Sequence, residues 1–246
     1  MSKMTTIALI SVGAGILLCL LSYVLVGGKW TGYNSRGNEY VQMDYESSTG
    51  ISKVSIDETA NTVILKSDDT DRVLIEYSDD PEKPEYVIKE EDGKLKFEKN
   101  SRNSFKLFNI DFSRRDITVT LPKDYKGELE VDLTSGEIDA KDVTASDIKM
   151  DNTTGSIKLE NIESLGDVRI ENTTGEIVFE NLKSGGDIKL ENTTGSIEGT
   201  IEGSEDDYSI KTEVTTGDCN LSDSKGGSKK LDVEITTGSI EIGFTK

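Results

Sequence analysis

Acidic residues recur along the second half of the sequence at steps of 19 to 22 residues. They hold the same place in a repeated pattern, and they are Asp132, Asp151, Glu171, Glu191, Glu213 and Glu234. Carboxylate oxygens are the ligands that Ca²⁺ prefers, and a row of negative charges also attracts cationic peptides and basic protein surfaces. If the repeats stack, these residues form one outward stripe, which we take as the candidate binding stripe.

A second charged column lies two residues before the acidic one. It reads Glu130, Lys149, Arg169, Lys189, Lys211 and Asp232, so its centre is basic. The simpler interpretation is an exposed array of ion pairs, each worth at most about 1 kcal/mol. The more specific interpretation is a ladder of carboxylates that binds divalent cations. Neither an EF-hand loop nor a Gly-Gly-x-Gly-x-Asp repeat supports calcium binding.

The composition excludes several classes of chemistry. The chain of 246 residues contains no histidine, which removes Ser-His-Asp and Cys-His catalysis and the commonest zinc ligand. Its two cysteines, Cys19 and Cys219, lie far apart in the sequence. A formal charge of −19 would repel nucleic acids. We therefore expect no catalytic residues, no metal, no cofactor and no nucleic-acid partner.

The elements that must position the stripe follow from a glycine that recurs with it. This glycine follows Thr-Thr in five copies and Thr-Ser in the first, and stands at Gly136, Gly155, Gly175, Gly195, Gly217 and Gly238. A period near twenty, with two strand-like arms in each copy, predicts an all-β fold of the β-solenoid type. The regular repeats are expected over residues 126–246.

The phase of the alternation locates the corners of each coil. Ile148 faces inward, and strict alternation places Asn152 and Thr154 inward too. The alternation changes phase after Gly155, which predicts a corner there, and changes again at residues 161–162. In this interpretation the two adjacent threonines point in opposite directions, so they cannot form a flat threonine surface of the ice-binding kind.

Stacking the copies in sequence order gives two apolar columns. The first is Leu129, Ile148, Val168, Ile188, Ile210 and Leu231, and the second is Ile138, Ile157, Ile177, Ile197, Cys219 and Ile240. Both are expected to form the core. Cys219 is then a buried, unreactive thiol. The fifth copy carries a longer loop, which either caps the solenoid or marks an insertion.

A third inward column contains amides. It reads Leu133, Asn152, Asn172, Asn192, Val214 and Ile235, so apolar residues flank the three asparagines. Buried amides must be hydrogen-bonded. Asparagines one rung apart are expected to bond to one another as an amide ladder.

The N-terminal part of the chain differs from the repeats. Residues 7–26 are uncharged and mostly apolar, long enough for one transmembrane helix, so residues 1–30 are interpreted as a membrane anchor and 31–50 as a linker. A cleaved signal peptide is the alternative. Residues 51–125 are expected to form irregular β-structure that opens the solenoid. Its strands are expected at 54–56, 62–66, 72–77, 85–90, 94–99 and 116–121, with a hairpin turn at Asp92-Gly93.

Two stretches resemble a known family. The segment DITVTLPKDYKGELEVDLTSGEI at 116–138 and the Asn-Thr-Thr-Gly copies after it resemble the LiaG-like putative adhesin family of bacteria. The resemblance implies a β-solenoid that is exposed at the cell surface, tethered to the membrane and non-enzymatic. It implies a link to the cell envelope, in some members to envelope stress, and brings no catalytic residues.

The leading hypothesis is therefore a binding or scaffolding module. We expect a single-pass protein of the cell membrane whose C-terminal β domain lies outside the cytoplasm. Its partners would be the membrane, through the N-terminal helix, and an envelope polymer, a cationic peptide or a membrane protein. Two alternatives remain open, a polysaccharide-acting β-helix enzyme and a polymerising scaffold of the bactofilin kind.

Overall fold

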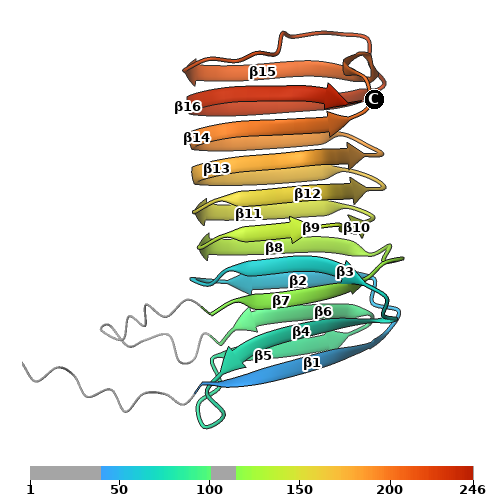
Figure 1. Cartoon of the computed structure of the whole chain (residues 1–246), viewed down its shortest axis with the longest axis vertical. Helices are drawn as coiled ribbons and strands as arrows, with labels where there is room; N and C mark the ends of the chain where they lie inside the picture. Colours follow the sequence, from blue (N-terminus) through green and yellow to red (C-terminus); the bar gives the residue numbers. More distant parts are fainter. Residues whose placement is uncertain (1–39, 101–114, 246) are drawn as a thin grey trace, which may run out of the picture. The chain divides into compact units, whose positions relative to one another are not determined.

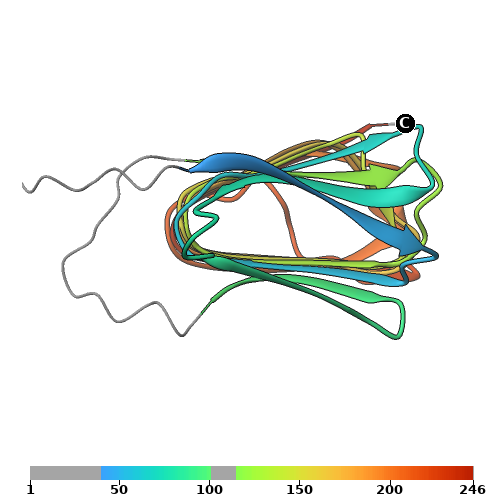
Figure 2. The same cartoon turned by 90° about the horizontal axis from the view of Figure 1, so that it is seen from below.

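A computed structural model describes residues 40–100 and 115–245 of the chain (Figure 1). These residues form an all-β, solenoid-like unit in which one sixteen-stranded sheet winds round a narrow core. Figure 2, the view turned by 90°, shows the sheet folded into two layers. The expected all-β solenoid is thus confirmed for the described residues, and none of their helices is long and apolar enough to cross a membrane. The expected anchor at 7–26 lies outside them.

We call the layer that carries the acidic column the acidic face. In hydrogen-bonding order it is made of β5 (Tyr86–Glu91), β6 (Lys94–Lys99), β2 (Lys53–Glu58), β8 (Glu128–Ser135), β11 (Ile148–Thr154), the first halves of β13 (Val168–Ser184), β14 (Ile188–Glu202) and β16 (Lys229–Thr245), and β15 (Tyr208–Thr216). A short 3₁₀ turn, Glu205–Asp207, precedes β15. Nearly all these strands run parallel, because each coil repeats the last one.

The other layer is the opposite face. It is made of β1 (Val41–Thr49), β4 (Arg72–Asp79), β7 (Ile117–Pro122), β3 (Val63–Asp68), β9 (Ile138–Lys141), β12 (Ile157–Ser164) and the second halves of β13, β14 and β16. The short strand β10 (Thr144–Ala145) pairs with β12. All the strands expected in the irregular region are present, and β5 and β6 form the hairpin expected at Asp92-Gly93. Residues 41–49, expected in a linker, instead form the edge strand β1.

The Thr-Thr-Gly corner requires glycine for two reasons. Gly155 has φ +126°, and a Cβ there would lie 1.7 Å from the carbonyl oxygen of Gly136 on the neighbouring coil. The backbone turns before this glycine, so Thr153 and Thr154 are both exposed. The expectation that Thr154 faces inward, opposite to Thr153, is therefore wrong. The alternation ends at Asn152 because the corner begins one residue earlier than strict alternation implies.

The buried asparagines do not form the expected amide ladder. The side-chain amides of Asn152, Asn172 and Asn192 donate to the corner carbonyls of Gly136, Gly155 and Gly175, at 3.3, 3.0 and 2.8 Å. The corner turns each glycine carbonyl toward the amide of the next coil, so main chain replaces side chain as the acceptor.

An amide ladder does form at the second corner. Asn181 donates to Asn161 at 3.0 Å, and Asn161 donates to Asp142 at 2.8 Å. All three residues have φ between 53° and 56°. This left-handed conformation is one that asparagine and aspartate tolerate better than most residues.

The last two copies stack in reverse order. β16 lies between β14 and β15, so the sixth copy in sequence is the fifth in space. The expectation that the columns follow sequence order is wrong at this point. β16 continues round the corner and completes a coil, whereas β15 is followed only by the isolated bridge of Cys219 to Ile240. The incomplete coil therefore caps the stack, and Cys219 is only partly buried.

Charge also favours this order. Asp232 on β16 lies in register between Lys189 on β14 and Lys211 on β15. Sequence order would place the two lysines side by side. At the other end, the coil of β2 and β3 likewise lies inside the later coil of β6 and β7. An aromatic cluster of Tyr77, Tyr86 and Phe97 fills the core there.

Candidate functional site

Parallel register brings the acidic stripe together. Asp132, Asp151, Glu171, Glu191, Glu234 and Glu213 follow one another in that spatial order, one per rung. The structure extends the stripe by two rungs, because Asp57 pairs with Asp132 and Glu98 pairs with Asp57. Sequence analysis missed both, although each follows an inward residue, Ile56 or Phe97, by one position. Their strands lack the Thr-Thr-Gly motif that aligned the other copies.

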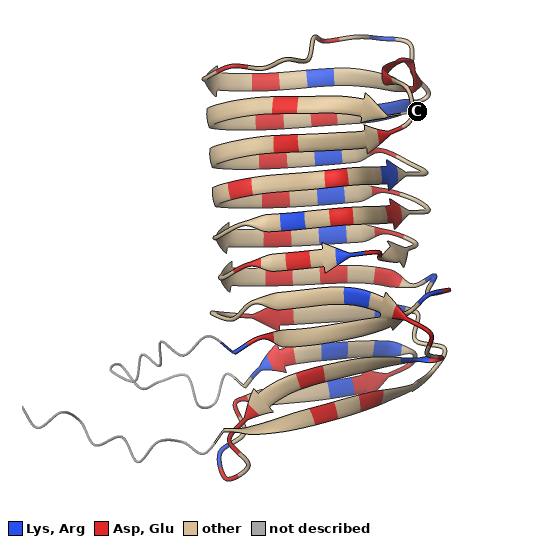
Figure 3. Cartoon of the chain, in the orientation of Figure 1, with Lys and Arg blue, Asp and Glu red and all other residues tan. Residues whose placement is uncertain are grey.

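Ion pairs link the acidic stripe to basic residues along five of the strands. Lys149 contacts Asp151 at 2.6 Å, Lys189 contacts Glu191 at 2.7 Å, and Arg169 pairs with Glu171. Lys211 pairs with Glu213 and Lys96 with Glu98 in the same way. Figure 3 shows these columns as stacked red and blue patches. The exposed array of ion pairs expected from the sequence is therefore present.

Two of the six acids expected from the sequence lie where the basic column is interrupted by another acid. Asp132 has Glu130 beside it, and Glu234 has Asp232 beside it. Among the described residues, neither Asp132 nor Glu234 has a cationic side chain within ion-pair distance. Burial, followed by the charges of Asp57 and Asp151, raises the pKa of Asp132. The stripe is thus electrically balanced at its centre and negative at these two rungs.

A shallow groove of about 310 Å³ runs along this part of the acidic face. One wall is the acidic column from Asp132 to Glu234, and the other is a threonine column of Thr153, Thr173, Thr193 and Thr236. The asparagines between the columns form its floor. The groove crosses the strands, so a ligand lying in it would meet the same pair of side chains at each rung, about every 4.8 Å.

Two carboxyls in the groove lie in register on adjacent strands. Glu171 pairs with Glu191, and the guanidinium of Arg169 contacts both side chains. Burial and then the neighbouring Glu191 carboxyl raise the pKa of Glu171. Burial also acts to raise the pKa of Glu191, but the hydrogen bond from Lys189 and the neighbouring Glu171 carboxyl outweigh it and lower that pKa.

The cation-binding ladder finds no support in the geometry. Within residues 40–100 and 115–245, no group of three acidic or thiol side chains is placed to hold a metal ion. Five carboxylates of the stripe contact lysine or arginine nitrogens instead. Their role as a binding stripe stays a prediction.

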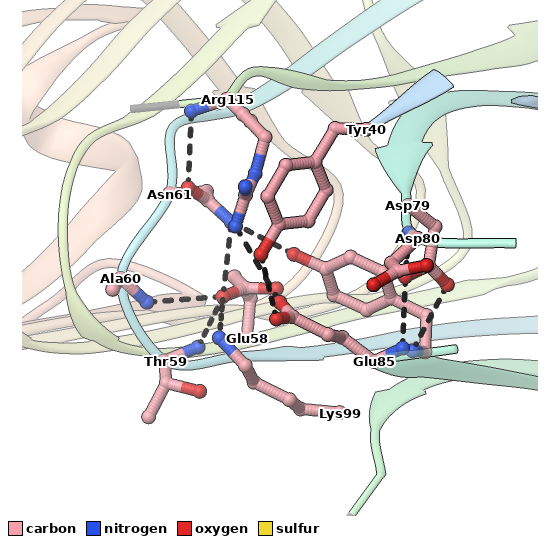
Figure 4. A network of polar contacts seen from close by, with 11 residues as sticks. Tyr40, Glu58, Thr59, Ala60, Asn61, Asp79, Asp80, Glu85, Lys99 and Arg115 are labelled. Carbon is pink, nitrogen blue, oxygen red and sulfur yellow. Dashed lines mark hydrogen bonds and ion pairs between the residues drawn. The ribbon is translucent and has the colours of Figure 1, made fainter. Parts of the chain in front are cut away.

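A second polar cluster lies at the other end of the core, and no repeated sequence pattern predicts it (Figure 4). Glu58 is 1% exposed, and its Oε1 accepts hydrogen bonds from the main-chain N–H groups of Thr59 and Ala60, at 2.8 and 3.0 Å. Asn61 is 3.4 Å from the same oxygen, and Lys99 lies 3.6 Å away. Burial, and then the charge of Glu58, raises the pKa of the neighbouring Tyr86.

The outer part of this cluster joins chain segments that are distant in sequence. The guanidinium of Arg115 stacks on the ring of Tyr40 at 3.5 Å and contacts Glu85 at 3.4 Å, while the Tyr40 hydroxyl donates to Glu85 at 2.8 Å. Asp79 accepts the main-chain N–H groups of Glu85 and Tyr86. The buried charges are thus hydrogen-bonded or paired, which is typical of a cluster that fixes chain segments in place.

Comparison with solved structures finds similar bacterial proteins, and the one with a TM-score above 0.5 shows the same fold. A "putative cell adhesion protein" from Clostridium sporogenes ATCC 15579 aligns over 84% of this chain and 100% of its own, with 15% identity and a TM-score of 0.53. A "putative adhesin" from Bacteroides fragilis NCTC 9343 aligns over 83% of this chain and 97% of its own, with 12% identity and a TM-score of 0.38. A "putative lipid binding protein" from Parabacteroides distasonis ATCC 8503 aligns over 86% and 98%, with 13% identity and a TM-score of 0.30.

The family is shown by sequence. No functionally curated protein matches the chain. The model of one domain family, Toastrack DUF4097, matches residues 51–246, which confirms the resemblance to the LiaG-like adhesins. The match covers every repeat and the irregular region before them, and so the chain belongs to the Toastrack DUF4097 family.

Proposed function

We propose that this chain is a non-enzymatic binding module of the bacterial cell envelope, tethered by residues 7–26, with its β domain outside the cytoplasm. The observation that carries the proposal is the groove between the acidic and threonine columns, an open surface that repeats the same two side chains over successive rungs. The adhesion proteins among its structural neighbours support a binding role.

The charges of the groove indicate the class of ligand. Asp132 and Glu234 are the acids without a cationic neighbour, so they attract cationic groups most strongly. Between them, ion pairs occupy Asp151, Glu171 and Glu191, and the threonine hydroxyls offer hydrogen bonds. An extended ligand with amines or guanidines along its length fits this pattern, whether it is a cationic peptide or an amine-bearing envelope polymer.

Charge neutralisation tests this assignment. We expect Asp132→Asn with Glu234→Gln to weaken binding of a fluorescent oligolysine to the full chain several-fold at low salt, with less effect at high salt. The matched control is Glu180→Gln with Glu198→Gln, two exposed acids of the opposite face, which removes the same charge. Equal losses for both double variants would show attraction to the net charge alone, and would contradict a site in the groove.

Location requires a separate experiment. Protease added outside intact cells should remove the β domain while leaving a short membrane-bound fragment. A cysteine placed at the exposed Thr173 should be labelled by a membrane-impermeant maleimide in a Cys219→Ser background. Protection from both reagents until the cells are opened would place the domain inside and reject the proposed topology.

One observation favours the alternative of a polysaccharide-acting enzyme. Glu171 and Glu191 have pKa values shifted in opposite directions, as acid and base pairs often do. Glu171 is paired with Arg169 and Glu191 with Lys189, so neither carboxyl is free to act on a glycosidic oxygen, which favours the binding role. Release of soluble sugar from cell-wall polysaccharide by the wild type, with loss of that release in Glu171→Gln, would establish the enzyme instead.

A further inference from the structure

The edge strands at the two ends of the sheet differ in how many of their main-chain groups are hydrogen-bonded. At the C-terminal end, Ile210 of β15 exchanges two main-chain hydrogen bonds with Ser224, at 3.1 and 3.0 Å. The Asp223 carboxylate accepts the main-chain N–H of Thr212 at 2.8 Å. On the opposite face, the side chain of Asn220 both donates to and accepts from the main chain of Ile242. These contacts occupy edge groups that would otherwise pair with another strand.

The N-terminal end has a longer open edge. β1 spans nine residues, Val41–Thr49, and among the described residues it pairs with β4 alone. Its pairing is regular from Val41 to Glu46, and a bulge follows, where the Ser47 hydroxyl accepts the main-chain N–H of Val73 at 3.0 Å. The regular part therefore presents one free edge of main-chain donors and acceptors, the arrangement to which an extended peptide can add a strand.

The side chains of β1 restrict what can add. Asp44 and Glu46 are exposed on its outer side, β1 contains no basic residue, and Glu46 contacts Arg72 of β4 at 3.3 Å (Figure 3). Met43 and Tyr45 lie on the inner side, partly buried at the open end of the core. An added strand would thus meet carboxylates on one side and apolar surface on the other.

A second copy of this chain is a poor occupant. In the antiparallel registers centred on Asp44 or Tyr45, Asp44 would lie opposite Asp44 or Glu46 of the other copy. Like charges directly opposite each other destabilise a strand pair, and opposite charges stabilise it. Charge complementarity therefore selects a partner strand whose outward residues are lysine or arginine.

We infer that the free edge of β1 is a docking site for an extended segment of a partner protein in which basic and apolar residues alternate. The basic residues of that segment lie beside Asp44 and Glu46, and the apolar residues extend the core next to Met43 and Tyr45. This surface lies at the end of the stack, outside the groove, and the inference does not rest on the proposed function.

The test uses the full chain in a non-ionic detergent and a fluorescent octapeptide of alternating lysine and valine. Fluorescence anisotropy should show saturable binding, and Asp44→Asn with Glu46→Gln should weaken it roughly threefold to tenfold, as expected for two cross-strand charge pairs. Methylating every second amide of the peptide on one edge should abolish binding, because it removes the donors while leaving the charge. The measurements are repeated in the background of Asp132→Asn with Glu234→Gln, which weakens binding to the groove. The matched control is Glu180→Gln with Glu198→Gln, which should bind the octapeptide like the wild type.

Each contrary outcome identifies another occupant or none. In the groove-variant background, undiminished binding of the methylated peptide, or an equal loss in Glu180→Gln with Glu198→Gln, would reject strand addition at β1. Light scattering that shows a dimer dispersed by Asp44→Lys would assign the edge to a second copy. Octapeptide binding that appears only after residues 101–114 are deleted would assign it to a segment of the same chain. Any one of these results would overturn the inference.

Discussion

The side-chain amide of Asn172 donates to the main-chain carbonyl of Gly155 on the neighbouring coil, at 3.0 Å. The same bond recurs one rung away on each side. It satisfies a carbonyl that the corner turns inward, while the Oδ1 atom of Asn172 is buried without a hydrogen-bond partner among the described residues. The corner and the asparagine are therefore one repeated unit.

This unit predicts losses of stability of different size for two substitutions of Asn172. Asn172→Ala should lower the free energy of unfolding by about 1–3 kcal/mol, because it leaves the Gly155 carbonyl buried and unpaired. Asn172→Leu should recover only part of that loss, since leucine fills the space in a column that also holds Leu133 but cannot donate to the Gly155 carbonyl. Urea denaturation of the full chain measures both. A leucine variant less stable than the alanine variant would contradict this account.

Gly155→Ala should be more damaging than any exposed substitution in the repeat. The new Cβ would lie 1.7 Å from a main-chain oxygen that a parallel strand holds in place, and φ is +126°. We expect a loss of more than about 3 kcal/mol or failure to fold. Gly226→Ala is the control, because φ there is +145° but no atom lies within 4 Å. Similar losses at both positions would mean that backbone conformation, rather than the clash, sets the cost.

The reversed order of the last two coils can be tested by disulfide formation. Thr194 and Thr237 are paired residues of adjacent strands, whereas Thr194 and Thr216 are separated by a strand. In a Cys219→Ser background, cysteines at 194 and 237 should form a disulfide under mild oxidation. Cysteines at 194 and 216 should not, because two rungs, about 9.6 Å, exceed the reach of a disulfide. Reversed yields would restore sequence order.

The stability of the acidic face should depend on pH in two opposing ways. The pKa of Glu130 is lowered, first by the hydrogen bond from Lys53, so its contribution is present above the unfolded-state pKa and is lost as the pH falls through the folded-state pKa. The pKa of Asp132 is raised, so its ionised form destabilises the fold at neutral pH, and this penalty disappears in acid.

Asp132→Asn should therefore stabilise the protein at pH 7, by no more than about 1 kcal/mol, with a smaller difference near pH 3. Glu130→Gln should destabilise at pH 7 and converge with the wild type in acid. Thermal melts across this range check both signs, and a gain for Asp132→Asn that grows toward low pH would show the cause to be other than charge.

The regular coils could be predicted from the sequence because each rung repeats the same environment. Ile157 and Ile177 align by the repeat period alone, and so do Asp151 and Glu171 of the acidic column. Three features were not predicted from the sequence, because they depend on contacts that the repeat period does not encode. Asp57 and Glu98 belong to strands without the motif, β16 changes place with β15, and the Asn172 acceptor is a main-chain atom. The cluster around Glu58 comes from segments with no repeat at all.

That cluster gives the last prediction, since it is the one place in the described core where a carboxylate is buried with its partners around it. Glu58→Ala would leave the Thr59 and Ala60 N–H groups and the Lys99 ammonium without their acceptor. We expect a loss of about 2–4 kcal/mol, because hydrogen bonds to a charged acceptor contribute about 1.5–3 kcal/mol each and Lys99 is partly exposed.

Glu58→Gln keeps an acceptor of the same shape and should lose less. Lys99→Met separates the two contributions, because it removes the cation while the main-chain bonds remain. If the main-chain bonds dominate, as their distances of 2.8 and 3.0 Å against 3.6 Å for Lys99 indicate, Lys99→Met will cost less than Glu58→Ala by urea denaturation. Equal costs for the two variants would instead assign the stability of this corner to the ion pair.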